Sequence, residues 1–173
     1  MTVQLFVDEC KRRGFVMAVV EADAHTVKVD RKQLRSFLLK GQERLHFSSE
    51  SSRRRDAIWS GIERWRSPMT VHIVQSSHRY QTQARAECLG GIAALATSLD
   101  ANLLVIERDD SRYQDDRGIL TNGLRGTGLH WEILEAKADP MLWAADAAAW
   151  CWTHPSRSWR KRVEPFVGQI IQT

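Results

Sequence analysis

The sequence predicts an α/β domain in which helices flank a mixed β-sheet. Two apolar stretches, residues 3–7 and 15–20, lie so close together that an antiparallel hairpin is the natural connection between them. Further along the chain, strand-like stretches alternate with helical patterns, which is typical of a sheet covered by helices. A hairpin followed by such alternation favours a mixed sheet over a purely parallel one. The length of 173 residues suits one domain over residues 1–173.

The first strands and helix follow from the spacing of apolar residues. The stretch 3–7 predicts a strand, and the continuous apolar stretch 15–20 predicts a strand that is covered on both faces. Residues 24–39 have helical spacing, with β-branched residues near the beginning that leave the first residue of the helix open. Gly41 ends this helix, and residues 44–47 predict a short third strand.

A second helix and a strand–helix pair come next in the prediction. Ser51 or Ser52 is a suitable N-cap, and Pro68 ends the helix because it disfavours helical geometry at the residue before it. Residues 69–74 predict a strand. Residues 79–99 predict the longest helix, with one buried line of apolar side chains.

The C-terminal part continues the alternation. Residues 102–106 predict a buried strand, residues 115–125 a polar helix, and residues 130–134 another strand. Pro140 suits the first position of the following helix, where its missing N–H costs nothing, and this helix extends to about residue 152. A basic segment and a short amphipathic end complete the chain.

The charge composition bears on the kind of partner that the protein could bind. Lys and Arg number 25 against 21 Asp and Glu, and the basic residues cluster at 11–13, 53–55 and 157–162. This balance permits an anionic partner without requiring one.

The cysteine count and the apolar runs indicate a cellular setting. The three cysteines are far apart and odd in number, which argues against a disulfide framework or a zinc ribbon. Since no run approaches the ~20 apolar residues of a membrane span, and the N-terminus lacks a long apolar segment, we expect a soluble cytoplasmic protein.

Three carboxylates occupy positions that solvation alone does not explain. Asp8 and Glu107 each follow an apolar strand, and Asp146 interrupts the most apolar helix, on the same face as Trp143 and Trp150. An unpaired buried carboxylate costs several kcal/mol or stays protonated. An arginine or a metal ion is therefore expected beside them.

Each acid also has an ordinary structural interpretation. Asp8 suits a turn or cap, Asp146 suits a pair with a Lys or Arg, and Glu107 begins a charged run typical of a solvated loop. Taken together, however, the three fit a site for Mg²⁺ or Mn²⁺, which prefer carboxylate oxygens. Two such ions activate water and stabilise the leaving oxygen of a phosphodiester, and the cations at 11–13 would attract its backbone.

The order of these motifs resembles the ribonuclease H-like superfamily. It is closest to an uncharacterised bacterial family whose first strand ends in Asp-Glu-Ser-Gly and whose late helix reads Leu-x-x-Ala-Asp-x-x-Ala. The matching segments are FVDEC at 6–10, GQERLHF at 41–47 with Glu50 and the arginines 53–55, LVIERDD at 104–110, and LWAADAAAW at 142–150. The resemblance implies a ribonuclease H-like mixed β-sheet flanked by helices, and a metal-dependent nuclease.

Carried over by position, the resemblance makes Asp8, Glu107 and Asp146 the metal ligands and catalytic acids, with Mg²⁺ or Mn²⁺ as cofactor. Glu9 would then either support the ligands or replace one of them, and Asp110 is likewise an alternative ligand. The chain departs from the family pattern at residues 10 and 11, where Cys-Lys replaces Ser-Gly, and at Glu107, where Asp is commoner.

Other residues have two interpretations each. His46 is either a hydrogen-bonded core histidine or a general base beside the metal site. Arg85 lies on the buried line of the long helix, where it could neutralise the acids. The basic segments and Trp159 are either ordinary surface or contacts for a phosphate backbone and stacked bases. The candidate substrate contacts are Lys11, Arg12, Arg13, Arg53, Arg54, Trp159 and Arg160.

Three functions remain open from the sequence. The first is a metal-dependent nuclease, a hydrolase that cleaves RNA or DNA. The second is a nucleic-acid-binding module of the same fold without catalysis. The third is a structural protein in which Arg12, Arg13 or Arg85 pairs with the acids. Nothing in the sequence indicates RNA versus DNA, endo- versus exonuclease action, or the oligomeric state.

Overall fold

One mixed sheet organises the molecule, and its strands are ordered β5-β4-β1-β2-β3-β6. The computed structural model describes residues 1–65 and 69–173, so the helix end predicted at Pro68 lies outside the described residues. The strands are β1 (Val3–Cys10), β2 (Phe15–Asp23), β3 (Thr70–Ser76), β4 (Leu103–Glu107), β5 (His130–Leu134) and β6 (Val167–Gln172).

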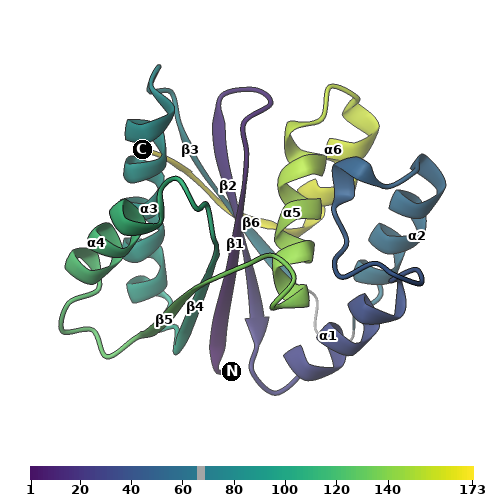
Figure 1. Ribbon diagram of the computed structural model, residues 1–173, viewed down its shortest axis with the longest axis horizontal. Helices are drawn as coiled ribbons and strands as arrows, with labels where there is room; N and C mark the ends of the chain where they lie inside the picture. The colour runs from purple at the N-terminus through teal and green to yellow at the C-terminus, as the bar shows by residue number, and fades with distance from the viewer. Residues whose placement is uncertain (66–68) are drawn as a thin grey trace.

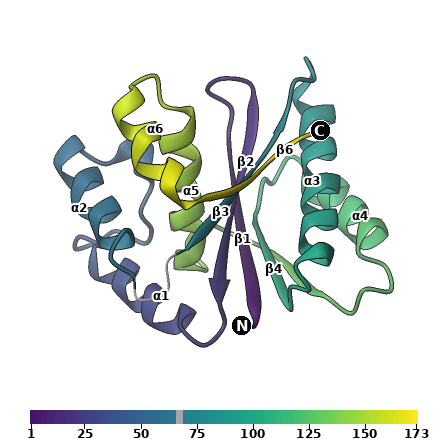
Figure 2. The ribbon, with the colours of Figure 1, turned by 180° about the vertical axis from the view of Figure 1, so that it is seen from behind.

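Helices cover both faces of this sheet, as Figure 1 and the reverse view in Figure 2 show. Helices α3 and α4 lie on one face, and α5, with α1, α2 and α6, lies on the other. The helices are α1 (Val27–Ser36), α2 (Ser52–Ile62), α3 (Gln81–Ser98), α4 (Tyr113–Gly123), α5 (Pro140–Thr153) and α6 (Arg157–Val163), with short 3₁₀ turns at Phe47–Ser49 and Glu164–Phe166. Among the described helices, none has the length and apolar character needed to cross a bilayer.

Strand pairing confirms the predicted mixed sheet. The pairs β1–β2 and β2–β3 are antiparallel, whereas β1–β4, β4–β5 and β3–β6 are parallel. Helical crossovers connect the parallel neighbours, as parallel pairing requires. The central strands β1 and β2 are therefore buried on both faces, which explains their nearly continuous apolar sequences.

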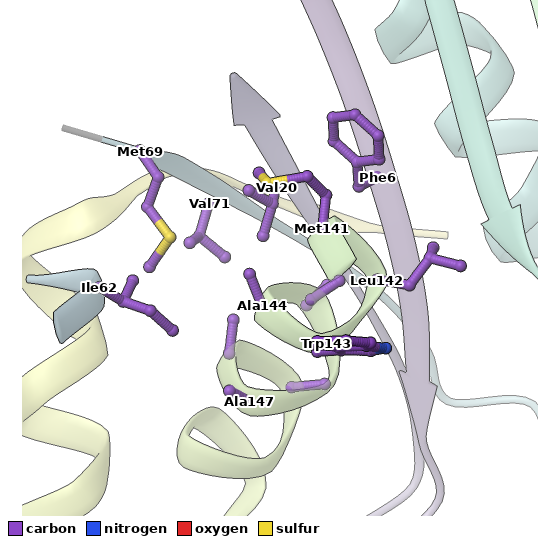
Figure 3. Close-up of a cluster of buried hydrophobic side chains, with 14 of the residues drawn as sticks. Phe6, Val20, Ile62, Met69, Val71, Met141, Leu142, Trp143, Ala144 and Ala147 are labelled. Carbon is purple, nitrogen blue, oxygen red and sulfur yellow. The ribbon is translucent and has the colours of Figure 1, made fainter. Parts of the chain in front are cut away.

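The most apolar helix, α5, packs directly on the centre of the sheet. Ala144 and Ala147 are fully buried, and their small side chains allow the helix backbone to approach β1 and β2 closely. Figure 3 shows this helix among Phe6, Val20 and Val71 of the sheet. The helix begins at the predicted position, because Asp139 is its N-cap and accepts a hydrogen bond from the backbone N–H of Met141.

Three segments differ from the sequence-based prediction. Residues 44–47 are not a strand, because Phe47 is a buried anchor whose backbone N–H donates to the carboxylate of Asp146 rather than to a sheet. The first helix is shorter than predicted at both ends, and Gly41 lies in the turn after it with a φ of 86°. The C-terminal end forms β6 at the sheet edge, where its exposed side chains give little apolar alternation.

Candidate active site

The sheet register brings Asp8 and Glu107 side by side. Strands β1 and β4 are parallel and pair Val7 with Ile106, so the next residue of each strand lies at the same edge. Side chains alternate between the faces of a strand, so Asp8 points to the same face as Phe6, the face covered by α5. Glu107 follows the same rule on β4.

Asp146 reaches this pair from the helix above it. Helix α5 packs on β1, and the half-buried Asp146 accepts a hydrogen bond of 2.7 Å at Oδ2 from the backbone N–H of Phe47. The negative charges of Glu107 and Asp146 both raise the pKa of Asp8, which shows that the three carboxylates lie close together. Three acids from distant parts of the chain thus meet at the C-terminal ends of β1 and β4.

Burial dominates the electrostatics of this carboxylate cluster, which we define as Asp8, Glu107 and Asp146. Burial is the main cause that raises the pKa of each acid, and repulsion from Asp146 adds to it for Glu107. A hydrogen bond between Asp8 and Glu107 raises the pKa of Asp8 and lowers that of Glu107. These causes favour the protonated form of Asp8 over that of Glu107.

Few positive charges balance this cluster. Arg44 Nη1 lies 3.7 Å from Glu107 Oε1, and the positive charges of Arg44 and His46 lower the pKa of Glu107 and Asp146. Over residues 1–65 and 69–173, neither Asp8 nor Asp146 has a Lys, Arg or His in salt-bridge contact. The third functional interpretation, in which Arg12, Arg13 or Arg85 pairs with these acids, therefore finds no such pair among the described residues.

Arg85 has other partners on the opposite face of the sheet. It is a buried side chain on α3 whose Nη2 lies 2.8 Å from Asp116 Oδ2, and its Nη1 also pairs with Glu9. Glu9 follows Asp8 on the strand and so points away from α5. Neither Arg85 nor Glu9 is part of the carboxylate cluster. The carboxyl group of Asp110, 86% exposed and paired with Arg108, is outside it as well.

The donor set of the cluster fits a hard divalent cation, because all its atoms are carboxylate oxygens and two acids lack a described counter-charge. In the part of the chain that the structure describes, however, no group of three or more His, Cys, Asp or Glu side chains is arranged to hold a metal ion. Metal binding remains a prediction.

A pocket of about 290 Å³ opens beside the cluster. Its lining includes Asp146, Trp150, His46 and the basic residues Lys11 and Arg12. The two ring nitrogens of His46 lie 3.1 Å from the hydroxyl oxygens of two neighbouring serines, so its ring orientation is fixed. The structure therefore places the predicted general base at the rim of the site.

Two guanidinium groups flank the tryptophan in this pocket. The Arg12 group lies 5.1 Å from the ring centroid of Trp150, and that of Arg55 lies 4.6 Å from it. Arg55 donates hydrogen bonds to the carbonyl oxygens of Phe47 and Ser48, which fixes it over the ring. The sequence analysis did not include Arg55 among the substrate contacts, although it belongs to the same arginine run.

The two neighbours of Arg55 in the arginine run, Arg53 and Arg54, do not face the pocket. Arg54 pairs with Glu50 and donates to the carbonyl oxygen of Phe37, so it holds the preceding loop and does not face the pocket. Arg53 is exposed and does not line this pocket. The predicted contacts at Arg53 and Arg54 thus lie away from the carboxylate cluster.

The remaining predicted contacts are Trp159 and Arg160 of α6 and Arg13 of the β1–β2 turn. Trp159 is half-buried and packs edge-on against Phe47 and Trp150, with ring centroids 5.8 and 5.3 Å away. Arg160 lies over the ring of Trp152 at 3.9 Å. It lines a second pocket together with Arg13, apart from the carboxylates.

Comparison with known proteins supports the fold but assigns no function. No protein-family model matches the sequence, and no curated protein shows significant similarity to it. The structure is similar to a chain of the PCNA:RNase HII complex from Archaeoglobus fulgidus, with a TM-score of 0.53 and 15% sequence identity. The match covers 94% of this chain and 75% of the other. The chain therefore has a ribonuclease H-like fold.

Proposed function

We propose that the protein is a metal-dependent nuclease that hydrolyses phosphodiester bonds in RNA or DNA. The observation that supports this most strongly is the meeting of Asp8, Glu107 and Asp146 at one sheet edge, beside a pocket lined by basic and aromatic side chains. The structural likeness to a chain of an RNase HII complex is consistent with the proposal. Fold alone does not determine function, so the proposal depends on the site.

The three carboxylates would hold Mg²⁺ or Mn²⁺. When bound, such ions polarise an attacking water and stabilise the charge on the leaving oxygen. Asp8 would release its proton when the cation binds, and the positive charge of the cation would offset the repulsion among the three carboxylates. His46, fixed by its serine contacts, faces the same pocket and is the candidate group for proton exchange with the substrate.

The pocket beside the cluster offers contacts for a nucleic-acid strand. Arg12 and Arg55 supply positive charge for backbone phosphates, and Lys11 adds a third cation at the rim. Trp150 is only 5% exposed and packs against both guanidinium groups and His154, so its role is to hold the two arginines in place. Backbone contacts of this kind position a strand without reading its sequence.

A cleavage assay with matched variants tests the proposal. Labelled single-stranded, duplex and hybrid substrates are incubated with Mn²⁺ or with EDTA. We expect Mn²⁺-dependent cleavage by the wild-type protein and by Asp110→Ala, which removes an exposed carboxylate outside the cluster, and a loss of at least ~100-fold in Asp8→Ala. Equal rates for Asp8→Ala and Asp110→Ala would refute the assignment.

The hydrogen bond between Asp8 and Glu107 favours a second candidate, a nucleic-acid-binding module without catalysis. In that case the acid pair keeps its proton and excludes the cation. Binding would then be salt-sensitive, show no turnover with any divalent ion, and persist in Asp8→Ala. The same substrates, assayed for binding and for cleavage, distinguish the two functions.

A further inference from the structure

A second basic pocket lies beyond the C-terminal end of α5. It has a volume of about 430 Å³ and is enclosed by the β1–β2 hairpin, the end of α5 and α6. Figure 1 shows the hairpin turn and α6 at the same end of the molecule. From Asp146 to His154, which lines this pocket, the chain advances roughly 12 Å along the helix. The pocket is thus a neighbour of the carboxylate cluster and shares no carboxylate with it.

The charges around this pocket are strongly unbalanced. Arg13, Arg157 and Arg160 line it, against the single carboxylate of Glu164, which lies 3.4 Å from Arg160. Two positive charges therefore remain uncompensated. Arg13 and Arg157 are exposed and pair with no acid among residues 1–65 and 69–173, so their charges are available to a ligand.

His154 adds a neutral hydrogen-bond donor. Its Nδ1 accepts a hydrogen bond of 3.0 Å from the backbone N–H of Ser156, so the proton of the neutral ring is on Nε2. Burial lowers the pKa of His154, and the charges of Arg12, Arg55 and Arg13 lower it further. The neutral form of the ring is thus favoured, and its environment is positive.

We propose that this pocket binds a phosphomonoester, either the terminal phosphate of a nucleic-acid strand or the phosphate of a free nucleotide. A phosphomonoester carries about −1.5 to −2 charges at neutral pH, which matches the two uncompensated positive charges better than the single charge of an internal phosphodiester. Guanidinium groups bind phosphate oxygens in pairs with defined geometry. The nucleic-acid form of the proposal rests on the proposed function, whereas the free-nucleotide form does not.

Binding measurements in EDTA test this without cleavage. Short single strands that differ only in a 5′-phosphate, a 3′-phosphate or hydroxyl ends are compared by fluorescence anisotropy. We expect a phosphate at one of the two ends to tighten binding by about tenfold. Adenosine monophosphate should compete for this gain, whereas adenosine should not. Calorimetry of adenosine monophosphate with the protein alone should show direct binding.

The variants isolate the pocket. Arg13→Ala/Arg157→Ala should abolish the gain from the terminal phosphate and the binding of adenosine monophosphate. Arg125→Ala removes an exposed arginine on the other face of the sheet and should leave both unchanged. Both pocket arginines are exposed, so we expect the variants to fold, and thermal melting checks this.

Two results would overturn the proposal. One is equal affinity for all three strands together with no binding of adenosine monophosphate. The other is a phosphate gain that survives in the double variant. A protein that fails to cleave any substrate with Mn²⁺ but retains the phosphate gain would refute the proposed nuclease function alone, so the two failures are distinguishable.

Discussion

The substitution Asp8→Asn should stabilise the metal-free protein at neutral and alkaline pH. Asp8 is 8% exposed, and burial and the neighbouring acids raise its pKa in the folded state well above that of an unfolded chain. A group with a raised folded pKa contributes its full stability below its unfolded pKa, and this contribution is lost as the pH rises through the folded pKa. An asparagine amide keeps the hydrogen bond to Glu107 without a proton to lose.

The magnitude follows from this linkage. Each unit by which the folded pKa exceeds the unfolded pKa costs about 1.4 kcal/mol of stability at a pH above both. For a protein of this size, that corresponds to roughly 3–6 °C in melting temperature per unit. The stability gain of Asp8→Asn over wild type should therefore be smallest near pH ~4 and should grow as the pH rises.

Thermal unfolding in EDTA over a series of pH values measures this difference. Asp110→Asn is the control, because its exposed carboxylate should give a difference that does not change with pH. Added Mn²⁺ should raise the melting temperature of wild type and have no effect on Asp8→Asn. If Asp8→Asn is less stable than wild type at neutral pH in EDTA, Asp8 is an ordinary ionised and satisfied carboxylate, and the electrostatic reasoning fails.

Three further substitutions give separate readouts. Arg85→Ala leaves the buried Asp116 without its partner, whereas Glu9 keeps Lys11, and should reduce the free energy of unfolding in urea by about 3–5 kcal/mol, with or without Mn²⁺; a change below ~1 kcal/mol contradicts a buried ion pair. Phe47→Ala should cost about 3–5 kcal/mol, because it leaves a cavity among three tryptophans; full stability in the same urea titration would show that this side chain is not an anchor. Arg55→Ala should weaken nucleic-acid binding and reduce the slope of log affinity against log salt by about one, more than Arg53→Ala does; equal slopes would remove Arg55 from the interface.

The parts of the site that the sequence predicted depend on short-range patterns. Apolar strands that end in Asp8 and Glu107, and an apolar helix with one acid at position 146, are visible without a structure. Parallel neighbours place their carboxyl ends at one edge, and this geometry brings the first two acids together. The mixed sheet was predictable for the same reason, because the hairpin and the alternating pattern both have local signals.

The parts that the sequence did not predict depend on long-range contacts. Phe47 has the alternating neighbours of a strand residue, but it packs among Trp59, Trp150 and Trp159, which are remote in sequence. The functions of neighbouring arginines also differ only through tertiary contacts, as Arg54 and Arg55 show. Edge strand β6 gave no signal because most of its side chains are exposed.

Whether Asp8, Glu107 and Asp146 bind a divalent cation together is measured most directly by calorimetric titration of Mn²⁺ into the metal-free protein. Buffers with different heats of ionisation report how many protons are released. Wild type and Asp110→Asn should bind Mn²⁺ and release the proton held by Asp8, whereas Asp8→Asn and Asp146→Asn should lose binding. Unchanged Mn²⁺ binding in both cluster variants, or no binding by wild type, would contradict a shared metal site.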